Sequence, residues 1–330
     1  MEILIDSRWD GDSGIGRVYR EVIKHTPSNI NISKVNKSFS LGSPLSPLYL
    51  AWQIVNQPAN VFWSPSFMPP LYSKIPYIIT VHDLMHLYYY SKFHAYYMRY
   101  VLAPLFKKSQ IITVSEFTKQ LLITELGLSG DSINLVYNGV DNSFFTNKDI
   151  YILNRPYIVY VGNRRAYKNI ERMIVAFSRA NISKDMVFAL SGKSSPELDK
   201  IISKNNVEGR VCFLGYIDEE KLPSIYKGAS ALFYMSLMEG FGLPIIEAMA
   251  SGTPVITSNT SSMVEISNRA AAICNPLNVR EMTEQLELVL NNPRYKSELQ
   301  IKGLENAKRF TWDKTAKQTW EIITSMPISA

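Results

Sequence analysis

The chain has 330 residues, of which 46% are hydrophobic, 12% aromatic and 19% charged. This length suits about two domains, and this composition excludes a disordered or low-complexity protein. The net charge is +6 without a tract of Lys and Arg, so we expect no nucleic-acid partner. There are only two cysteines, Cys212 and Cys274, which excludes a disulfide framework and favours a cytoplasmic location.

Short runs of Val, Ile, Tyr and Phe recur along the chain and predict strands that are buried on both faces. In the first half they are residues 2–5, 61–63, 77–81 and 111–114, and in the second half 157–161, 187–190, 211–214, 231–234 and 254–257. Stretches with helical spacing lie between them, most clearly at 116–126, 170–179, 198–204, 219–227 and 245–250. This alternation predicts parallel sheets covered by helices.

The strand–helix series runs twice, which predicts an α/β protein of two Rossmann-like, doubly wound domains facing across a cleft. We expect an N-terminal domain at 1–150 and a C-terminal domain at 151–310, with a turn-rich linker between them near 138–156. The last segment, 311–330, reads as a helix that packs back onto the first domain. In such folds, ligands bind beyond the carboxyl ends of the strands.

Two candidate sites follow strands of the first half. Gly14-Ile15-Gly16 leads into a helix, where glycines allow a ligand to approach the backbone, but Tyr19 replaces the third glycine of the dinucleotide fingerprint. A plain tight turn explains these glycines equally well. His82-Asp83 ends another strand and could hydrogen-bond hydroxyls or share a proton. The alternative is a strand-end histidine that Asp83 ties into a turn.

A basic loop, residues 162–169, follows the first strand of the second half. It carries Arg164, Arg165 and Lys168 beside Gly162 and a helix start, which favours an anion site. The planar guanidinium of Arg and the compact ammonium of Lys both bind phosphate oxygens. The alternative is a solvated basic loop. Its sequence is not a P-loop, because no Gly-Lys-Ser/Thr follows.

The segment 238–256 is the most informative. Pro244 suits a first helical position, so the amides of Phe241, Gly242 and Leu243 are expected at a helix mouth that can bind an anion. Glu239 precedes this mouth, and Glu247 lies about one turn inside the helix. A favourable acidic first turn explains Glu247 but not Glu239.

Taken together, these segments resemble the family 4 retaining glycosyltransferases of the GT-B fold, similar to bacterial O-antigen mannosyltransferases. EGFGLPIIEAMASGTPVI carries the Glu-x7-Glu motif of that family, and VGNRRAYKN resembles its phosphate-binding loop. TVHDL, VSEFTKQLL, VYNGVD and the run from FLGYIDEEKL onward also match in order. One departure is VEISN at 264–268, where the family often has Pro-Glu-Val/Ile followed closely by Gly.

The resemblance implies a nucleotide-diphosphate sugar as donor, no cofactor and no metal. Glu239 would contact the transferred sugar, Glu247 the ribose, Lys168 and one of Arg164 or Arg165 the diphosphate, and His82 the reacting centre. The remaining residues implied at the donor are Gly14, Gly16, Asn163, Gly192, Gly215, Tyr216, Phe241, Gly242 and Leu243. Asp83 would lie on the acceptor side. The second domain would bind the donor, and the first would bind the acceptor.

The resemblance also implies a function. We expect transfer of a hexose, with GDP-mannose as first guess, to a saccharide or lipid-linked acceptor in cell-surface polysaccharide biosynthesis. UDP- or dTDP-sugars remain open as donors, and a catalytically inactive sugar-nucleotide-binding subunit is an alternative. A sugar-nucleotide epimerase fits less well, because it should lack the paired glutamates and the Arg/Lys loop.

Residues 88–108 are unusually aromatic and basic, with six tyrosines, two phenylalanines, three lysines and an arginine. A helix of this kind could rest at the inner face of the plasma membrane on anionic head groups, near a lipid-linked acceptor. A domain-core helix with buried aromatics is an equal alternative.

Overall fold

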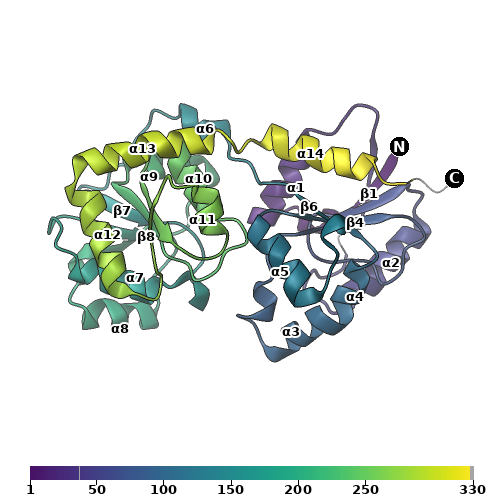
Figure 1. The fold of residues 1–330 in the computed structure, drawn as a ribbon, viewed down its shortest axis with the longest axis horizontal. Coiled ribbons are helices and arrows are strands. Elements are labelled where there is room, and N and C mark those ends of the chain that lie inside the picture. The colour runs from purple at the N-terminus through teal and green to yellow at the C-terminus, as the bar shows by residue number, and fades with distance from the viewer. Residues whose placement is uncertain (37, 328–330) are drawn as a thin grey trace. The chain divides into compact units, whose positions relative to one another are not determined.

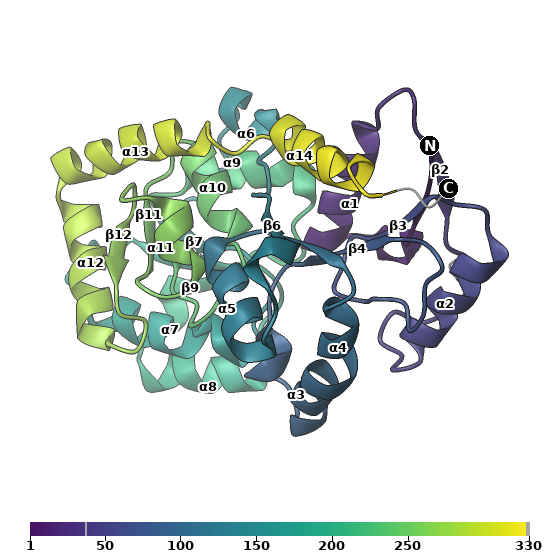
Figure 2. The ribbon, with the colours of Figure 1, turned by 45° about the vertical axis from the view of Figure 1, so that its right-hand side comes forward.

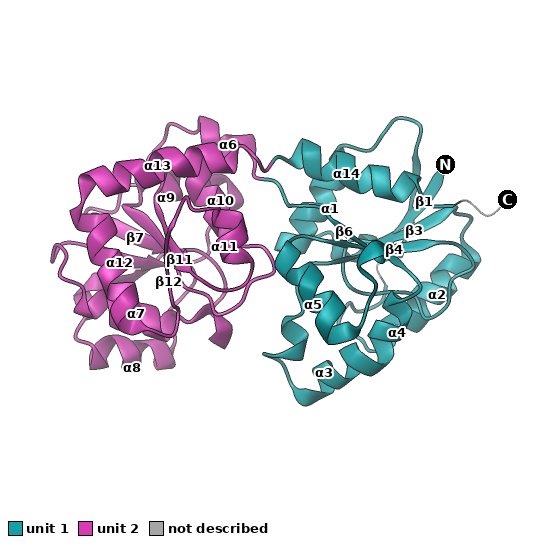
Figure 3. Cartoon of the chain, in the orientation of Figure 1, with its two compact units in different colours: residues 1–139, 311–330 teal, residues 140–310 magenta. Residues whose placement is uncertain are grey.

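The computed structural model describes residues 1–36 and 38–327 and divides the chain into two units (Figure 3). The first unit combines Met1–Gly139 with the C-terminal segment from Thr311, and the second holds Val140–Phe310. The division falls inside the turn-rich segment, ahead of the expected boundary at residue 150. That segment also contains a short helix, α6 (Asn142–Thr146), whose first turn is capped by the Asp141 carboxylate.

A six-stranded parallel sheet forms the centre of the first unit, in the order β2-β1-β3-β4-β5-β6. The strands are β1 (Glu2–Ile5), β2 (Asn31–Lys34), β3 (Val61–Ser64), β4 (Tyr77–Val81), β5 (Gln110–Thr113) and β6 (Ile133–Leu135). The longer helices are α1 (Gly14–Lys24), α2 (Ser46–Asn56), α3 (Lys92–Tyr97), α4 (Ala103–Phe106), α5 (Glu116–Leu126) and α14 (Trp312–Thr324). A π-helical stretch, η3 (Met98–Leu102), joins α3 to α4.

Neighbouring residues of β3 show how helices cover both faces of this sheet, because successive side chains of a strand point in opposite directions. Phe62 belongs to the core that α2, α4 and α5 cover. Trp63 faces the other side, where its ring lies 6.2 Å from that of Trp320 on α14. The Trp320 indole also donates to the carbonyl of Val22 on α1, so α14 lies beside α1 (Figures 1 and 2).

The second unit repeats the plan with a parallel sheet in the order β12-β11-β10-β7-β8-β9. Its strands are β7 (Tyr157–Tyr160), β8 (Val187–Leu190), β9 (Val211–Phe213), β10 (Ala231–Tyr234), β11 (Val255–Ser258) and β12 (Ala272–Cys274). The remaining helices are α7 (Ile170–Arg179), α8 (Pro196–Lys204), α9 (Leu222–Gly228), α10 (Leu243–Ala250), α11 (Ser262–Ser267), α12 (Val279–Asn291) and α13 (Pro293–Ala307). The predicted α/β class is therefore confirmed in both units.

One predicted helix differs in detail. Residues 219–227 form a 3-10 turn (Glu219–Lys221) and then α9, because Pro223 favours the start of a new helix. Within the described residues, no helix combines the length and the apolar character needed to cross a membrane.

Candidate functional site

Two loops of the second unit meet where neighbouring strands end. The basic loop follows β7, and the loop that contains Glu239 follows β10; β7 and β10 are paired in the sheet. The carboxyl ends of parallel strands share one edge, so the loops that follow them gather there. The amide of Leu237 donates to the carbonyl of Tyr167 at 2.7 Å, which joins the two loops directly.

Lys168 and Glu239 form a buried ion pair at this junction. The Lys168 Nζ lies 2.6 Å from the Glu239 Oε1, and each residue is 6% exposed. The hydroxyl of Tyr234, the last residue of β10, accepts from Lys168 Nζ at 2.9 Å and donates to the same Glu239 oxygen at 2.8 Å. Sequence reasoning identified the two charged residues, and the structure brings them into contact.

Two serines hold the backbone of Glu239. Ser261 Oγ accepts from the Glu239 amide at 3.1 Å, and Ser262 Oγ donates to the carbonyls of Glu239 and Phe241. Ser261 has a φ of 54°, a left-handed conformation that is unusual for serine. Both serines lie just ahead of the VEISN departure, in which Asn268 takes the left-handed position after α11.

Helix α10 carries the second glutamate. Gly242, with φ 103°, is its N-cap, and Pro244 is the second helical residue, one position later than predicted. The first amides of a helix have no partner within it, and they form the positive end of the helix dipole. Glu247 is 4% exposed and accepts a hydrogen bond from the Tyr226 hydroxyl of α9 at 3.0 Å.

Arg164 and Arg165 differ in their surroundings, although they are adjacent. The Arg164 guanidinium lies over the Phe213 ring and donates to the Lys193 carbonyl, while its Nη1 is buried without a hydrogen-bond partner among the described residues. Gly192, at φ 82°, leaves room for it, because a Cβ there would lie 2.8 Å from the Arg164 Nη2.

Four more predicted donor residues of this unit lie in the basic loop or follow β9, next to Gly192. Arg165 and Asn163 are exposed, and the Asn163 Oδ1 accepts from the Arg165 amide at 3.3 Å. The Gly192 amide donates to the Gly215 carbonyl, and the next residue, Tyr216, is 78% exposed.

Two tyrosines beneath the ion pair keep their protons. Burial, and then the negative charge of Glu239, raise the pKa values of Tyr160 and Tyr234 well above the ordinary value of 10.0. Their rings stack with centroids 5.7 Å apart, and the Tyr160 hydroxyl donates to the Asn163 carbonyl. Both hydroxyls therefore remain hydrogen-bond donors across the physiological pH range.

The glycine candidates of the first unit lie at the start of α1. Gly14 is the first residue of this helix, and the Ser13 hydroxyl caps the Gly16 amide at 3.1 Å. A Cβ on Gly16 would lie 1.9 Å from the Gly11 carbonyl oxygen, so close backbone approach requires glycine here.

The His82-Asp83 pair directly follows β4. The His82 Nε2 lies 2.8 Å from the Pro65 carbonyl oxygen, and burial lowers the pKa of this imidazole from its ordinary value of 6.5. The Asp83 carboxylate accepts from the Met85 amide at 2.9 Å, which is the turn that the structural alternative predicts. A neutral His82 with Nε2 donating leaves Nδ1 as an acceptor.

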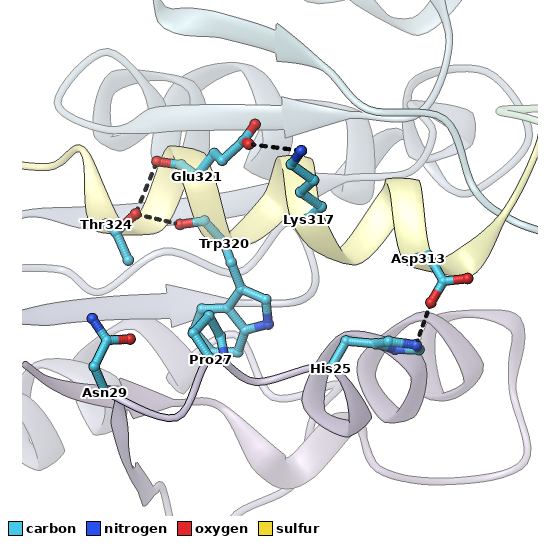
Figure 4. A pocket seen from close by; sticks show the side chains of 8 residues that line it. All are labelled: His25, Pro27, Asn29, Asp313, Lys317, Trp320, Glu321 and Thr324. Atoms are coloured by element: carbon cyan, nitrogen blue, oxygen red, sulfur yellow. Dashed lines mark hydrogen bonds and ion pairs between the residues drawn. The ribbon is translucent and has the colours of Figure 1, made fainter.

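Other parts of the chain look less like the predicted site. A pocket of about 480 Å³ in the first unit is lined by His25, Asp313, Lys317 and Trp320, and contains none of the predicted site residues (Figure 4). The expectation of no metal rested in part on the absence of an Asp-x-Asp motif. That part was wrong, because Asp10-Gly11-Asp12 has this spacing. Within residues 1–36 and 38–327, no group of three His, Cys, Asp or Glu side chains is placed to hold a metal ion.

Four residues of this site were missed from the sequence: Tyr226, Tyr234, Ser261 and Ser262. Tyr234 was placed at the end of a predicted strand, and that position was the available signal, because strand ends meet at the ligand-binding edge. The serines gave no comparable signal, since their contacts depend on a loop from another strand.

The two Rossmann-like sheets, with ligand-binding loops at their strand ends, are typical of the GT-B fold. A model of the family "Glycosyl transferases group 1" matches residues 144–310, and one of "Glycosyltransferase Family 4" matches residues 17–144. The chain belongs to the glycosyl transferases group 1 family, as the sequence resemblance indicated.

Relatives and solved structures agree with this assignment. O-antigen chain mannosyltransferase B of Escherichia coli is 27% identical over 293 residues, which cover 83% of this chain and 77% of that protein. O-antigen chain mannosyltransferase RfbU of Salmonella typhimurium is 31% identical over 60% of this chain and 56% of its own length. The crystal structure of Anabaena HepE with UDP and glucose has a TM-score of 0.81 at 16% identity, covering 99% and 100% of the two chains, and it supports the fold.

Proposed function

We propose that this chain is an active, retaining, metal-independent glycosyltransferase that transfers a sugar from a nucleotide-diphosphate donor to a saccharide or lipid-linked saccharide. The observation that carries the proposal is the Lys168–Glu239 pair beside Arg164 at the strand ends of the second unit. A buried cation, a guanidinium nitrogen without a partner and a helix N-terminus together form an environment for a diphosphate.

The leaving group explains why cations are needed here. Breaking a glycosyl–phosphate bond gives an oxocarbenium-like centre and adds negative charge to the departing diphosphate. Lys168, Arg164 and the Gly242 and Leu243 amides would stabilise that charge more in the transition state than in the ground state. These protein groups can supply the positive charge that a divalent metal supplies elsewhere.

The carboxylates would orient the neutral parts of the donor. Glu239 would hold hydroxyls of the transferred sugar, and Glu247 would hold the ribose hydroxyls, with Phe241 beside the diphosphate. The backbone at Gly215 and Tyr216 would contact the base. From the first unit, we propose Gly14 and Gly16 for the diphosphate, His82 for the reacting hydroxyl and Asp83 for the acceptor. The acceptor would attack from the face that the diphosphate leaves, and a diphosphate oxygen would take its proton.

GDP-mannose is the first donor to test. The names of the relatives, including O-antigen chain mannosyltransferase B and RfbU, support a mannose donor and a polysaccharide acceptor. The HepE structure contains UDP, so UDP-sugars form the second group.

Release of nucleoside diphosphate tests this function directly. The purified chain is incubated with GDP-mannose, UDP-sugars and dTDP-sugars, with and without EDTA. We expect release from one donor class, unaffected by the chelator. Binding without turnover in the presence of a suitable acceptor would instead favour an inactive sugar-nucleotide-binding subunit, and loss of turnover with EDTA would contradict metal independence.

We also propose that the first unit docks on an anionic membrane surface through residues 88–108. Phe93, Tyr96 and Tyr100 are 61%, 62% and 65% exposed at spacings of three and four residues, so they share one helical face. The inward face holds Met98, Leu102 and Phe106, which are buried. The alternative of a fully buried aromatic helix therefore does not describe this face.

Helix α2 extends this surface. Leu45, at its N-cap, and Leu48, Trp52 and Val55 are all about half exposed or more, at spacings of three, four and three. Its inward residues pack into the core that α4 also covers, and the Tyr97 hydroxyl donates to the Pro44 carbonyl just before α2. Both exposed stripes thus point away from one core.

The excess of positive charge around this surface favours a membrane with anionic lipids as its partner. From Val22 to Ser115 the sequence carries eight Lys or Arg residues and a single acidic residue, Asp83. The positive charge is therefore concentrated in this stretch. Basic residues attract anionic head groups, and exposed Trp, Tyr and Leu side chains enter the interface.

Flotation with vesicles tests this docking. We expect the chain to float with phosphatidylglycerol-containing vesicles at low salt, but not with pure phosphatidylcholine. Trp52→Glu with Tyr96→Glu should reduce binding about tenfold or more, since two apolar contacts are lost. Ile301→Glu, at an exposed position of α13 in the second unit, is the matched control. No binding by the wild-type chain would end the docking proposal.

A further inference from the structure

The ion pair at the proposed donor site is closed by a third group that the family motif does not contain. The Tyr234 hydroxyl and the Lys168 Nζ both donate to one oxygen of Glu239, and the same hydroxyl accepts from Lys168. The three groups form a triangle with sides of 2.6, 2.8 and 2.9 Å. Tyr234 is 1% exposed, so water does not compete for its hydroxyl.

A diphosphate would compete with Glu239 for Lys168. Moving Lys168 toward a phosphate would weaken its bond to Glu239, and a buried carboxylate that loses its partner is costly. The Tyr234 hydroxyl can keep its bond to Glu239 during that movement, because the hydroxyl belongs to a strand end and not to the basic loop. Stacking against Tyr160 and the O–H proton that Tyr234 retains fix the direction of this bond.

We propose that Tyr234 is a positioning residue of the donor site, whose hydroxyl holds Glu239 in place while Lys168 turns to the diphosphate of the donor. The inference rests on the proposed function of the second unit. It assigns Tyr234 no contact with the donor itself. Its consequence is that the ion pair opens on donor binding at a smaller cost than an isolated Lys–Glu pair would require.

A double-mutant cycle separates this role from simple packing. Binding of GDP and of UDP is measured by calorimetry for the wild type, Tyr234→Phe, Glu239→Gln and the double variant. We expect Tyr234→Phe to weaken binding of the recognised nucleotide about tenfold, because Lys168 then becomes the main partner of Glu239. In the Glu239→Gln background the same change should have less than about a twofold effect, because a neutral amide retains Lys168 less strongly.

The matched control is Tyr157→Phe. Tyr157 is also a buried tyrosine of this sheet, and its hydroxyl donates to the Ile225 carbonyl at 2.7 Å. Its removal should leave nucleotide binding unchanged, and thermal unfolding checks that each variant is folded.

Turnover gives a second readout. With the active donor, Tyr234→Phe should raise KM about tenfold and change kcat by less than about twofold. An equal effect of Tyr234→Phe in both backgrounds, or no effect in either, would overturn the positioning role. If the wild type binds neither GDP nor UDP, the cycle is run with dTDP. If it binds none of the three nucleotides, the proposed function fails instead, so the two failures are distinguishable.

Discussion

The candidate site of the second unit buries polar groups, whereas the surface of the first unit formed by α2 and residues 88–108 exposes apolar groups. In the second unit, Lys168, Glu239 and Tyr234 are buried and satisfy one another. In the first unit, Trp52, Tyr96 and Tyr100 are more than half exposed on a stretch nearly free of acidic residues. The polar groups of the one region satisfy one another, whereas the other region leaves apolar side chains exposed to solvent.

This contrast indicates which property of a ligand or surface each unit would select. A buried ion pair must be opened by a ligand of matching charge, so selectivity in the second unit depends on a competing anion. An exposed aromatic and basic surface has no ion pair to break. Its binding to a membrane would depend on the lipid composition and on the salt concentration. The variants below test this difference, beginning with the largest expected effect.

Removing Lys168 should have the largest effect. Lys168→Ala leaves the Glu239 carboxylate buried without its cation, which should cost about 3–5 kcal/mol of unfolding free energy. The variant also lacks the cation that we propose to stabilise the negative charge of the leaving diphosphate, so turnover should fall about 100-fold. Nucleoside diphosphate release and chemical denaturation measure the two losses. Lys200→Ala, an exposed lysine of α8, is the control; wild-type turnover in Lys168→Ala would refute the site.

A glycine of the first unit should give the next largest effect. Gly16→Ala places a Cβ against the Gly11 carbonyl oxygen and should destabilise the protein by about 3 kcal/mol. Gly11→Ala is the matched control, because a Cβ there meets nothing within 4 Å. Thermal unfolding compares the two. Equal stability of both variants would show that the α1 backbone has more room than the structure gives it.

The two arginines should differ from each other. Arg164→Ala removes a half-buried guanidinium with an unpartnered Nη1 and should lower turnover about tenfold. Arg165 is exposed, and its removal should lower turnover by less than about threefold, as expected for a screened surface charge. Initial rates at saturating acceptor measure both. The reverse order would assign the diphosphate to Arg165.

The smallest expected effect concerns acid stability. Because burial lowers the pKa of His82 from 6.5, the unfolded chain binds a proton at that residue more readily than the folded chain. His82 therefore contributes a loss of stability as the pH falls below about 6.5, and none above it. Denaturation curves over this range should show a smaller acid loss for His82→Gln than for the wild type; parallel curves would contradict the neutral, buried state.

Much of the fold follows from the sequence, because periodicity directly reports which faces of a strand or helix are buried. The run 77–81 became β4, and the run 157–161 became β7, which ends one residue earlier than predicted. The short helix α6 was missed because Asn142 and Ser143 also suit a turn. The charged site residues were recognisable by motif, but the contact between Lys168 and Glu239 became visible only in the structure.

What the sequence could not give were contacts made across loops. Tyr234 reads as an ordinary strand tyrosine until β7 and β10 are known to pair. The bonds from Ser261 and Ser262 to the Glu239 backbone depend on the loop after β11 and on the start of α11, and the VEISN sequence in α11 departs from the family. The exposure of Trp52 and Tyr96 likewise depends on which helical face the core covers.

A crystal structure of the chain with the nucleoside diphosphate of its active donor tests the central claim most directly. The account predicts a phosphate oxygen about 3 Å from the Lys168 Nζ, with the Tyr234 hydroxyl still bonded to Glu239. A diphosphate bound elsewhere, with the Lys168–Glu239 pair unchanged, would contradict it.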